Sequence, residues 1–333
     1  MDRAGRAPPV HAARGLYVLT GQAPEVLLHV GSPARGARWQ ELLPTLVSGL
    51  IVRQWPDVGD PAAIRYVAAW APPAGLLASL PHLEVVFSVG AGVDHLDLSD
   101  VPAHVPVVRM IEPGLVRGME EYAVFAVLAL HRGMLGHIAQ QRQGAWGDAD
   151  PVTATPARRI GIFGLGAIGG AVAARLASFD FAVAGWSRSP RSIDGVETFA
   201  GDATLAAFLA RTDILVNVLP LTDATRGIIG AATLARLPRG AGLVNIGRGG
   251  HVDEAALLLA LDSGHVGGAI LDVTSREPLP AGHPFWQHPR VLLTPHIAGT
   301  TDVSGGAAAI AEQILRHRRG DALTGVVDRQ AGY

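Results

Sequence analysis

Residues 159–177 have the sequence Arg-Ile-Gly-Ile-Phe-Gly-Leu-Gly-Ala-Ile-Gly-Gly-Ala-Val-Ala-Ala-Arg-Leu-Ala, which joins an apolar strand, a glycine turn and an Ala-rich helix. In this order the first glycine permits a tight turn, the second lets the backbone approach a pyrophosphate, and the third lets the helix pack on the strand. The anion lies at the helix N-terminus, where free N–H groups point at it. The residues of the turn that we expect to contact a dinucleotide are Gly164, Gly166, Ala167, Ile168 and Gly169.

The loop after the next apolar run indicates which dinucleotide binds. An NAD site usually has Asp or Glu about twenty residues after the glycine turn, where the carboxylate accepts from the ribose 2′-OH. Here Phe181–Gly185 is followed by Trp186, Ser187, Arg188 and Ser189, without a carboxylate. The serines can donate to a 2′-phosphate, and the Arg can pair with it or stack on adenine. We expect these four residues to contact the cofactor and NADP(H) to be preferred over NAD(H); a solvated basic loop is the alternative.

The composition excludes several classes of protein. The 333 residues are 49% hydrophobic and 17% charged, enough for two folded α/β domains. A net charge of −2, with the basic residues scattered, gives no reason to expect a nucleic-acid partner. The chain has no Cys, which excludes disulfides and thiolate chemistry, and no Lys, which excludes Schiff-base enzymes and Walker-type phosphate loops.

Hydropathy bears on location. No apolar run approaches the roughly 18 residues that span a bilayer, so we expect no membrane partner and a cytoplasmic protein. The N-terminal extension, residues 1–25, carries Arg3, Arg6 and Arg14 and does not fit a secretory signal.

Short apolar runs alternate with helix-compatible stretches along the rest of the chain. This alternation predicts parallel sheets in two α/β units, the second beginning near Ile160. Residues Arg38–Leu46 and Glu120–Leu135 are expected to be helical, and Gln140–Pro156 to form a loop. The expected strands are Val26–Val30, Gly49–Arg53, Tyr66–Trp70, Val85–Val89, Val105–Val108, Ile160–Phe163, Phe181–Gly185, Ile214–Leu219, Gly242–Ile246, Gly268–Asp272 and Val291–Thr294.

Three polar residues follow strands of the second unit within a few positions: Arg248, Glu277 and His296. Ligands of open α/β sheets bind beyond the carboxyl ends of the strands, so these side chains can converge on one cleft. A guanidinium binds a planar carboxylate at two points, and a His beside a carboxylate can deliver a proton to a carbonyl oxygen as hydride reaches carbon. We therefore predict that Arg248 holds and polarises a 2-oxo acid, that His296 is the general acid and that Glu277 is its partner. The other cofactor contacts that we expect are Leu219, Pro220, Ile246 and Asp272, the last against the nicotinamide.

Two other kinds of site use similar residues. A metal ion could bind His283, His288, His296 and Glu277, but no two-His helical spacing supports this, and we expect no metal. A Ser–His–Asp hydrolase would have a Gly-x-Ser-x-Gly elbow, which does not occur in the chain.

Several segments together identify a family. They are Phe87-Ser-Val-Gly-Ala-Gly-Val-Asp94, the glycine turn, Gly185-Trp-Ser-Arg-Ser189, Asn245-Ile-Gly-Arg-Gly249, Leu271-Asp-Val-Thr-Ser-Arg-Glu-Pro-Leu-Pro280, Thr294-Pro-His-Ile297 and Val327-Asp-Arg-Gln-Ala-Gly-Tyr333. From about Val26 to the C-terminus the chain resembles the D-isomer-specific 2-hydroxyacid dehydrogenase family. The Trp-Ser-Arg-Ser loop and the tail resemble its glyoxylate and hydroxypyruvate reductases.

The resemblance implies a two-domain α/β fold with two doubly wound parallel sheets. A Rossmann NAD(P)-binding domain would span residues 104–296. A flavodoxin-like substrate domain would combine residues 26–103 with 297–333. Hinges near Pro102–Val108 and Pro295–Thr300 would let the cleft between the domains close.

The resemblance also implies roles for individual residues. Arg248, Glu277 and His296 take the roles argued above, and the backbone N–H groups of Ala91 and Gly92 help bind the substrate carboxylate. Trp70 is either a wall of the substrate pocket or a core aromatic residue. Members of the family are typically homodimers through the nucleotide-binding domain, here through Glu120–Leu135 and the following arm.

The implied activity is NADPH-dependent reduction of glyoxylate and hydroxypyruvate to glycolate and D-glycerate. The partner would thus be a small 2-oxo or 2-hydroxy acid. Two alternatives remain open, a reductase of bulkier 2-oxo acids and a dinucleotide-sensing binding protein without turnover. Phosphite oxidation, which relatives perform with a substrate-binding Lys, is disfavoured because the chain has no Lys.

Overall fold

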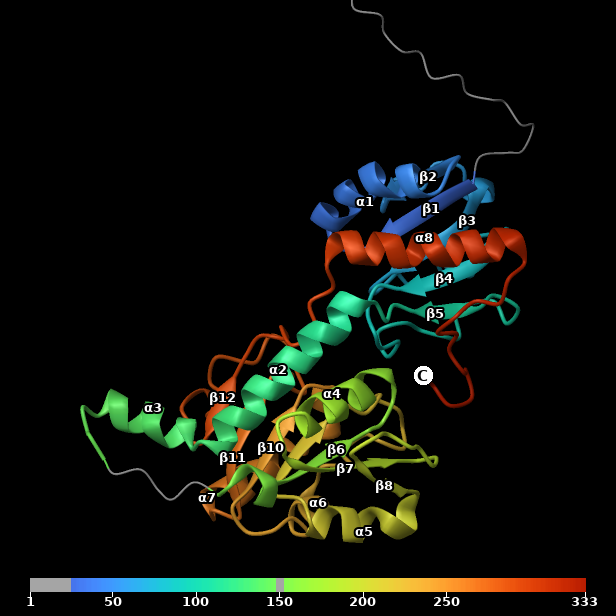
Figure 1. Cartoon of the computed structure of the whole chain (residues 1–333). Coiled ribbons are helices and arrows are strands. Elements are labelled where there is room, and N and C mark those ends of the chain that lie inside the picture. The colour runs from blue at the N-terminus through green and yellow to red at the C-terminus, as the bar shows by residue number, and fades with distance from the viewer. Residues whose placement is uncertain (1–24, 148–152) are drawn as a thin grey trace, which may run out of the picture.

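The computed structural model describes residues 25–147 and 153–333, which form two α/β units, each built on its own parallel sheet (Figure 1). The N-terminal extension predicted for residues 1–25 lies outside this range, apart from Glu25, where β1 begins. Within the described residues, short 3-10 helices occur at Pro61–Ala63, Thr155–Ala157, Gly249–His251 and Pro284–Trp286.

The first unit contains a five-stranded sheet in the order β2-β1-β3-β4-β5. This is the flavodoxin-like arrangement 2-1-3-4-5, in which every connection is a crossover between parallel strands. Trp39 and Leu43 on one helix and Ile310 and Ile314 on another are buried together against one face of the sheet. The strands are β1 (Glu25–Val30), β2 (Leu50–Gln54), β3 (Ile64–Ala69), β4 (Val85–Ser88) and β5 (Val107–Arg109), and the two helices are α1 (Pro33–Leu46) and α8 (Val303–Arg319).

The second unit contains a seven-stranded sheet in the order β12-β11-β10-β9-β6-β7-β8. Numbered from β6, this is the Rossmann order 3-2-1-4-5-6 with one further strand at the edge, and the order reverses between β6 and β9. Helices α2 (Pro113–His131) and α4 cover one face, and α5, α6 and α7 cover the other. The strands are β6 (Arg159–Phe163), β7 (Ala182–Ser187), β8 (Glu197–Ala200), β9 (Ile214–Asn217), β10 (Ala241–Asn245), β11 (Val266–Leu271) and β12 (Val291–Leu293). The helices are α4 (Ala167–Ala177), α5 (Asp202–Ala210), α6 (Ala231–Leu234) and α7 (Glu254–Asp262).

These sheets confirm the predicted fold class, with one strand that the sequence did not indicate. Strand β8 pairs only with β7, and its residues are exposed or half-buried. An edge strand with one buried face at most does not need the continuous apolar run that marks the central strands.

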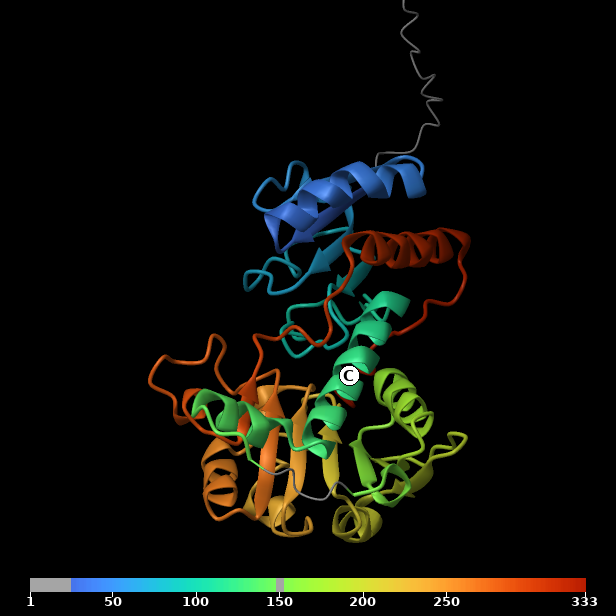
Figure 2. The same cartoon turned by 60° about the vertical axis from the view of Figure 1, so that its left-hand side comes forward.

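The helix expected at Glu120–Leu135 has different ends in the structure. Helix α2 (Pro113–His131) begins seven residues earlier, because Glu112 caps it by accepting from the N–H groups of Gly114 at 2.6 Å and Leu115 at 2.5 Å. Gly133, with φ +64°, ends this helix and starts α3 (Met134–Arg142), which takes up part of the predicted loop Gln140–Pro156. Helix α3 projects away from the second unit in Figure 1 and is turned toward the viewer in Figure 2.

Strand β5 bears on the limit between the units. It lies within the range expected for the nucleotide-binding domain, yet it pairs in parallel with β4 of the first sheet. We therefore propose that the first unit extends to Arg109 and that the chain crosses between Arg109 and Pro113, where α2 begins. The remaining limits, 26 and 297–333, stay predictions.

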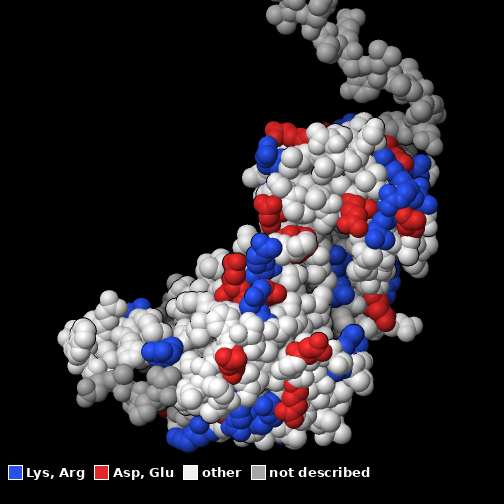
Figure 3. Space-filling view, viewed as in Figure 1, with Lys and Arg blue, Asp and Glu red and all other residues white. Residues whose placement is uncertain are grey.

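Charge and apolar helices complete the description of the surface. Figure 3 shows Arg and acidic side chains interspersed over one face; the basic end of α8 includes Arg318, paired with Glu25, and Arg319, paired with Asp321. Within residues 25–147 and 153–333, no single helix is both long and apolar enough to cross a membrane; α2 and α3, bent by 69°, pass that test only when they are taken together.

Candidate active site

The glycine turn connects β6 to α4 beside the point where the strand order reverses. Gly164 has φ +109°, and a Cβ there would lie 3.1 Å from the backbone N of Leu219. A Cβ at Gly169 would overlap the carbonyl oxygen of Gly164, so the helix packs directly on the turn. A Cβ at Gly166, the N-cap of α4, would meet nothing within 4 Å. Open space at a helix N-terminus fits a dinucleotide pyrophosphate.

The loop after β7 carries two exposed arginines, Arg188 and Arg191. Arg188 is exposed, whereas Ser187 is buried and donates from Oγ to the carbonyl oxygen of Ser189 at 2.7 Å. Trp186 lies in β7, and its contact with the cofactor stays a prediction. It is 5% exposed, packs on Phe163 and donates from Nε1 to a backbone carbonyl. The apolar core below β7 accounts for this Trp.

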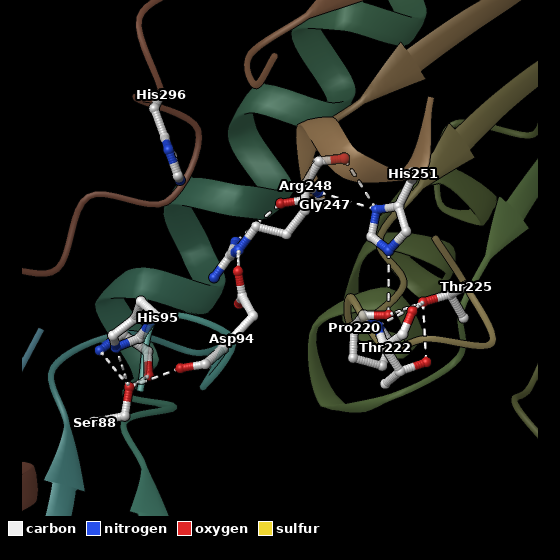
Figure 4. Close-up of polar contacts among 12 residues, drawn as sticks. Ser88, Asp94, His95, Pro220, Thr222, Thr225, Gly247, Arg248, His251 and His296 are labelled. Carbon is white, nitrogen blue, oxygen red and sulfur yellow. Dashed lines mark hydrogen bonds and ion pairs between the residues drawn. The ribbon is translucent and has the colours of Figure 1, made fainter. Parts of the chain in front are cut away.

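The other predicted cofactor residues lie at the ends of β9 and β10. Leu219 and Ile246 are buried in the core. The carbonyl oxygen of Pro220 accepts from Thr225 Oγ1 at 2.7 Å, which fixes the loop after β9 (Figure 4).

Arg248 follows β10 and reaches across to the first unit. Its Nε lies 3.0 and 3.1 Å from the two carboxylate oxygens of Asp94, which follows β4, and its Nη1 donates to Gly247 O at 2.9 Å (Figure 4). Its Nη2 occupies the space that a Cβ at Gly92 would fill, and donates no hydrogen bond to any described residue. Asp94 thus holds the guanidinium through Nε, and Nη2 faces the backbone of the loop predicted to bind substrate.

A buried histidine holds the backbone of Arg248. Nδ1 of His251 lies 3.1 Å from the Arg248 N–H and 2.9 Å from the side-chain nitrogen of Asn217, and accepts from both. Its Nε2 donates to Pro220 O at 3.2 Å. Burial lowers the pKa of His251, which keeps the ring neutral, as this pattern of bonds requires. His251 therefore ties Arg248 to the loop after β9.

His296 and Glu277 form a hydrogen-bonded pair. The distance from His296 Nδ1 to Glu277 Oε2 is 2.7 Å, and Glu277 Oε1 accepts from the Thr274 N–H at 3.1 Å. The carboxylate orients the ring, so that Nε2 is the nitrogen left to meet a ligand. In the view of Figure 4 the ring points toward Arg248. His296 has φ +55°, a conformation that L residues rarely adopt and that clusters at functional sites.

Asp272 holds the loop that carries His296. One of its oxygens accepts from Thr294 Oγ1 at 2.6 Å and from the Ile297 N–H at 2.8 Å, and the other from the Ala298 N–H at 2.8 Å. The Thr294 hydroxyl donates its one hydrogen to this carboxylate. Its oxygen therefore accepts from the hydroxyl of Tyr122 on α2. Asp272 is 2% exposed, and its contact with the nicotinamide stays a prediction.

The first unit supplies the opposite wall. Trp70 is 41% exposed, so it is not a core residue, and it stacks on His95 with ring centroids 3.9 Å apart. Burial lowers the pKa of His95 to about 4, so its ring is neutral. Ser88 lies 3.2 Å from His95 Nε2 and donates to Gly92 O at 2.7 Å (Figure 4). Ala91 is partly buried against the core of the second unit.

The histidines considered for a metal site do not converge. His283 pairs with Glu254 at 3.3 Å, His288 with Asp262 at 3.3 Å, and His296 with Glu277. In the part of the chain that the structure describes, no group of three or more His, Asp or Glu side chains could hold a metal ion.

The structure therefore brings Arg248, Glu277 and His296 to the same edge of the second sheet, opposite the loop Gly90–Gly92. Sequence reasoning missed Asp94 and His251. Asp94 shows the same signal as the predicted residues, a charged side chain soon after a strand, although its contact with Arg248 spans 154 positions. His251 lies three residues beyond Arg248, but nothing in the sequence indicates that its ring turns back to the backbone.

A family model agrees with this arrangement. Residues 124–298 match the NAD-binding domain of the D-isomer specific 2-hydroxyacid dehydrogenases. This range contains the glycine turn and the three predicted catalytic residues.

Several known proteins are similar over nearly the whole chain. Glyoxylate/hydroxypyruvate reductase A of Serratia proteamaculans is 42% identical over 288 residues, 85% of this chain and 91% of the relative. The protein of the same name from Yersinia enterocolitica is 40% identical over 302 residues, 89% of this chain and 96% of the relative.

Solved structures extend the similarity to the fold. The D-isomer specific 2-hydroxyacid dehydrogenase from Xanthobacter autotrophicus, in complex with NADPH and MES, has a TM-score of 0.89 and 40% identity, and covers 93% of this chain and 100% of its own. The NADPH-dependent glyoxylate/hydroxypyruvate reductase from Sinorhizobium meliloti, in complex with NADP and sulfate, has a TM-score of 0.86 and 38% identity over the same shares. With such identity over most of its length, the chain belongs to the D-isomer-specific 2-hydroxyacid dehydrogenase family.

Proposed function

We propose that the protein is an NADPH-dependent reductase of glyoxylate and hydroxypyruvate, which forms glycolate and D-glycerate. The observation that carries this proposal is the 2.7 Å pair of His296 and Glu277 on the same edge of the sheet as Arg248. The names of the relatives from Serratia and Yersinia support the substrate class, and the NADPH and NADP in the two solved structures support the cofactor.

Arg248 binds the carboxylate of the 2-oxo acid in this proposal. Asp94 occupies its Nε, which leaves Nη2 facing the backbone of Gly92. A carboxylate held between this nitrogen and the N–H groups of Ala91 and Gly92 would receive hydrogen bonds from both units. Such charge-assisted bonds fix the orientation of the substrate carbonyl.

His296 acts as the general acid. Glu277 accepts from Nδ1 and stabilises the imidazolium, so that Nε2–H can donate a proton to the carbonyl oxygen as the carbon is reduced. Arg248 and the protonated His296 together stabilise the negative charge that develops on that oxygen. Asp272 keeps the His296 loop in place through its three hydrogen bonds.

NADPH supplies the hydride when it is bound. The residues that would hold it are the glycine turn, with open space at Gly166, and the accessible Arg188, which follows a strand in a segment without a carboxylate. A guanidinium there favours the 2′-phosphate, whereas an NAD site has an acidic residue at the end of this strand. Closure of the two units about the crossings near Arg109–Pro113 and Pro295–Thr300 would exclude water from the site.

Product analysis tests the substrate assignment. Purified protein is incubated with NADPH and hydroxypyruvate or glyoxylate, and glycerate is resolved on a chiral column. The expected products are D-glycerate and glycolate. L-glycerate would contradict the proposed configuration of the product, and turnover confined to 2-oxo acids with bulkier side chains would replace the proposed substrate. NADPH binding without any turnover would instead support the sensing role.

We also propose that two copies associate through α2 and through residues 134–146, which comprise α3 and the segment after it. Phe125 is 50% exposed, Met134 42% and Trp146 102%, and aromatic and Met side chains are enriched in interfaces. Light scattering after size exclusion should give twice 34.6 kDa. Phe125→Asp should lower that mass toward one chain, and Leu259→Asp, on the exposed face of α7, serves as the control. A wild-type mass of one chain would contradict the proposal.

We place the enzyme in the cytoplasm, since a diffusible charged cofactor must be regenerated in the compartment where it is used. Fractionation should recover the protein with the other NADPH-linked enzymes. Recovery from membranes or from the culture medium would contradict this location.

A further inference from the structure

The last residues of the chain cross from the first unit to the cofactor loop of the second. After α8 the chain runs back along β5, where Val326 forms an antiparallel bridge with Val108 and Val327 N donates to Val107 O at 2.8 Å. This segment is therefore attached to the edge of the five-stranded sheet.

Arg329 attaches the tail, Val327–Tyr333, to the first unit. Its Nη1 donates to Leu98 O at 3.4 Å and Val101 O at 2.9 Å, and its Nη2 to Pro102 O at 2.9 Å and Val105 O at 2.6 Å. Four carbonyl partners around one planar group determine both its position and its orientation.

A tight turn follows Arg329 and determines the position of Tyr333. Asp328 accepts through Oδ1 from the N–H groups of Gln330 at 2.9 Å and Ala331 at 3.1 Å. Its backbone carbonyl accepts from Gly332 N at 2.8 Å, and its N–H donates to Tyr333 O at 3.1 Å. Gly332 has φ +78°, a conformation that suits glycine. Tyr333 is thus placed by a closed network of hydrogen bonds.

Tyr333 lies on the arginine of the cofactor loop. Nη2 of Arg188 donates to the phenolic oxygen of Tyr333, and its Cζ is 5.2 Å from the centre of the ring. Gly332 approaches the loop after β9, since a Cβ there would lie 3.5 Å from Thr222 Cγ2. Because β6 lies between β7 and β9, the tail reaches across the opening of the glycine turn, and Figure 1 places the C-terminus between the two units.

The hydrogen-bond chemistry of this pair points to an anion. A guanidinium has no acceptor, so the Tyr333 oxygen accepts from Arg188 and its own O–H hydrogen remains to be donated. A cation and a hydroxyl donor side by side form a site for a phosphate monoester. The loop after the second Rossmann strand is where the adenosine ribose of a dinucleotide binds.

We propose that Tyr333 is a cofactor-binding residue, which donates its hydroxyl to the 2′-phosphate of NADPH beside Arg188. The proposal rests on the proposed use of NADPH. Because Arg329 attaches the tail to the first unit, this contact also links cofactor binding in one unit to the position of the other.

The test compares two ligands that differ only in the 2′-phosphate. The dissociation constants of adenosine 2′,5′-bisphosphate and of 5′-AMP are measured by calorimetry for wild type, Tyr333→Phe and Gln330→Ala. Gln330 is an exposed tail residue that bonds through its backbone, so its variant is the matched control. Tyr333→Phe should weaken the bisphosphate about tenfold, equal to roughly 1.4 kcal/mol, and change 5′-AMP less than about twofold. The control should match wild type.

A double variant tests the partnership with Arg188. Arg188→Gln with Tyr333→Phe should weaken the bisphosphate by less than the product of the two single effects, since the two side chains contact each other and one phosphate. Equal weakening of both ligands by Tyr333→Phe, or none, would overturn the role of Tyr333 even if wild type prefers the bisphosphate. If wild type shows no such preference, the NADPH assignment itself is wrong.

Discussion

Asp94 and Arg248 join the two units across the cleft, with the carboxylate oxygens of Asp94 3.0 and 3.1 Å from Nε of Arg248. The side chains are 23% and 21% exposed, so solvent screens this pair only in part. The contact holds the guanidinium through Nε, and Nη2 faces Gly92. We therefore regard Asp94 as a positioning residue for the proposed carboxylate site.

Asp94→Asn should raise KM for hydroxypyruvate about tenfold, with a smaller change in kcat. The amide keeps the shape of the side chain but loses the charge that orients Arg248. Steady-state kinetics at saturating NADPH measures both constants. Asp97→Asn is the control, because this nearby exposed carboxylate accepts from the N–H and the hydroxyl of Ser99. A fall in kcat with KM unchanged would contradict a role in substrate binding.

His296→Asn should lower kcat about 10²–10⁴-fold, since a general acid contributes that much to the rate. Glu277→Gln should lower it less, because the ring remains but loses the carboxylate that stabilises its charged form. NADPH affinity, measured separately by calorimetry, should stay close to that of wild type for both variants. Unchanged turnover in His296→Asn would remove this residue from the mechanism.

Arg188→Asp should reverse the preference between the cofactors. The new carboxylate would repel the 2′-phosphate and accept from the 2′-OH of NADH, so the ratio of kcat/KM for NADPH to NADH should fall at least about tenfold. Arg236→Asp makes the same charge change at an exposed position outside the cofactor loop and should leave the ratio unchanged. The account of the loop fails if both variants keep the wild-type ratio.

His95 should make the protein less stable in mild acid. Burial lowers its pKa from 6.5 to about 4, so between these values the unfolded chain binds a proton that the folded protein excludes. Keeping the His95 ring neutral therefore costs no folding free energy above pH 6.5. Below pH 6.5 the free energy of unfolding falls by up to about 1.4 kcal/mol per pH unit. Wild type should lose about 1–2 kcal/mol more than His95→Gln between pH 7 and pH 5 in urea unfolding. Equal losses would show that His95 is not excluded from protonation.

Much of the fold was predictable because its central strands are buried on both faces. Parallel strands such as β6, β9 and β10 need continuous apolar runs, and these runs are visible in the sequence. The edge strand β8 is not buried on both faces, so it does not need such an apolar run, and the sequence did not predict it. The start of α2 was misplaced because its cap is Glu112, a residue type outside the usual preference for Ser, Thr, Asp and Asn.

The site was predictable only in its order along the chain. Arg248 and His296 follow strands whose carboxyl ends share one edge, so topology alone brings them to one cleft. The sequence did not show which polar residues bind other parts of the protein rather than a ligand. Asp272 turned out to hold the His296 loop, and Trp186 to fill the core. These assignments depend on side-chain directions and on contacts between distant segments.

The most direct test of the proposed function is the loss of reduced-cofactor absorbance when hydroxypyruvate is added to the purified protein, with NADPH and NADH run in parallel. We expect turnover with both cofactors and a higher kcat/KM for NADPH. No turnover with either cofactor would contradict the proposed activity. A clear preference for NADH would contradict the proposed cofactor.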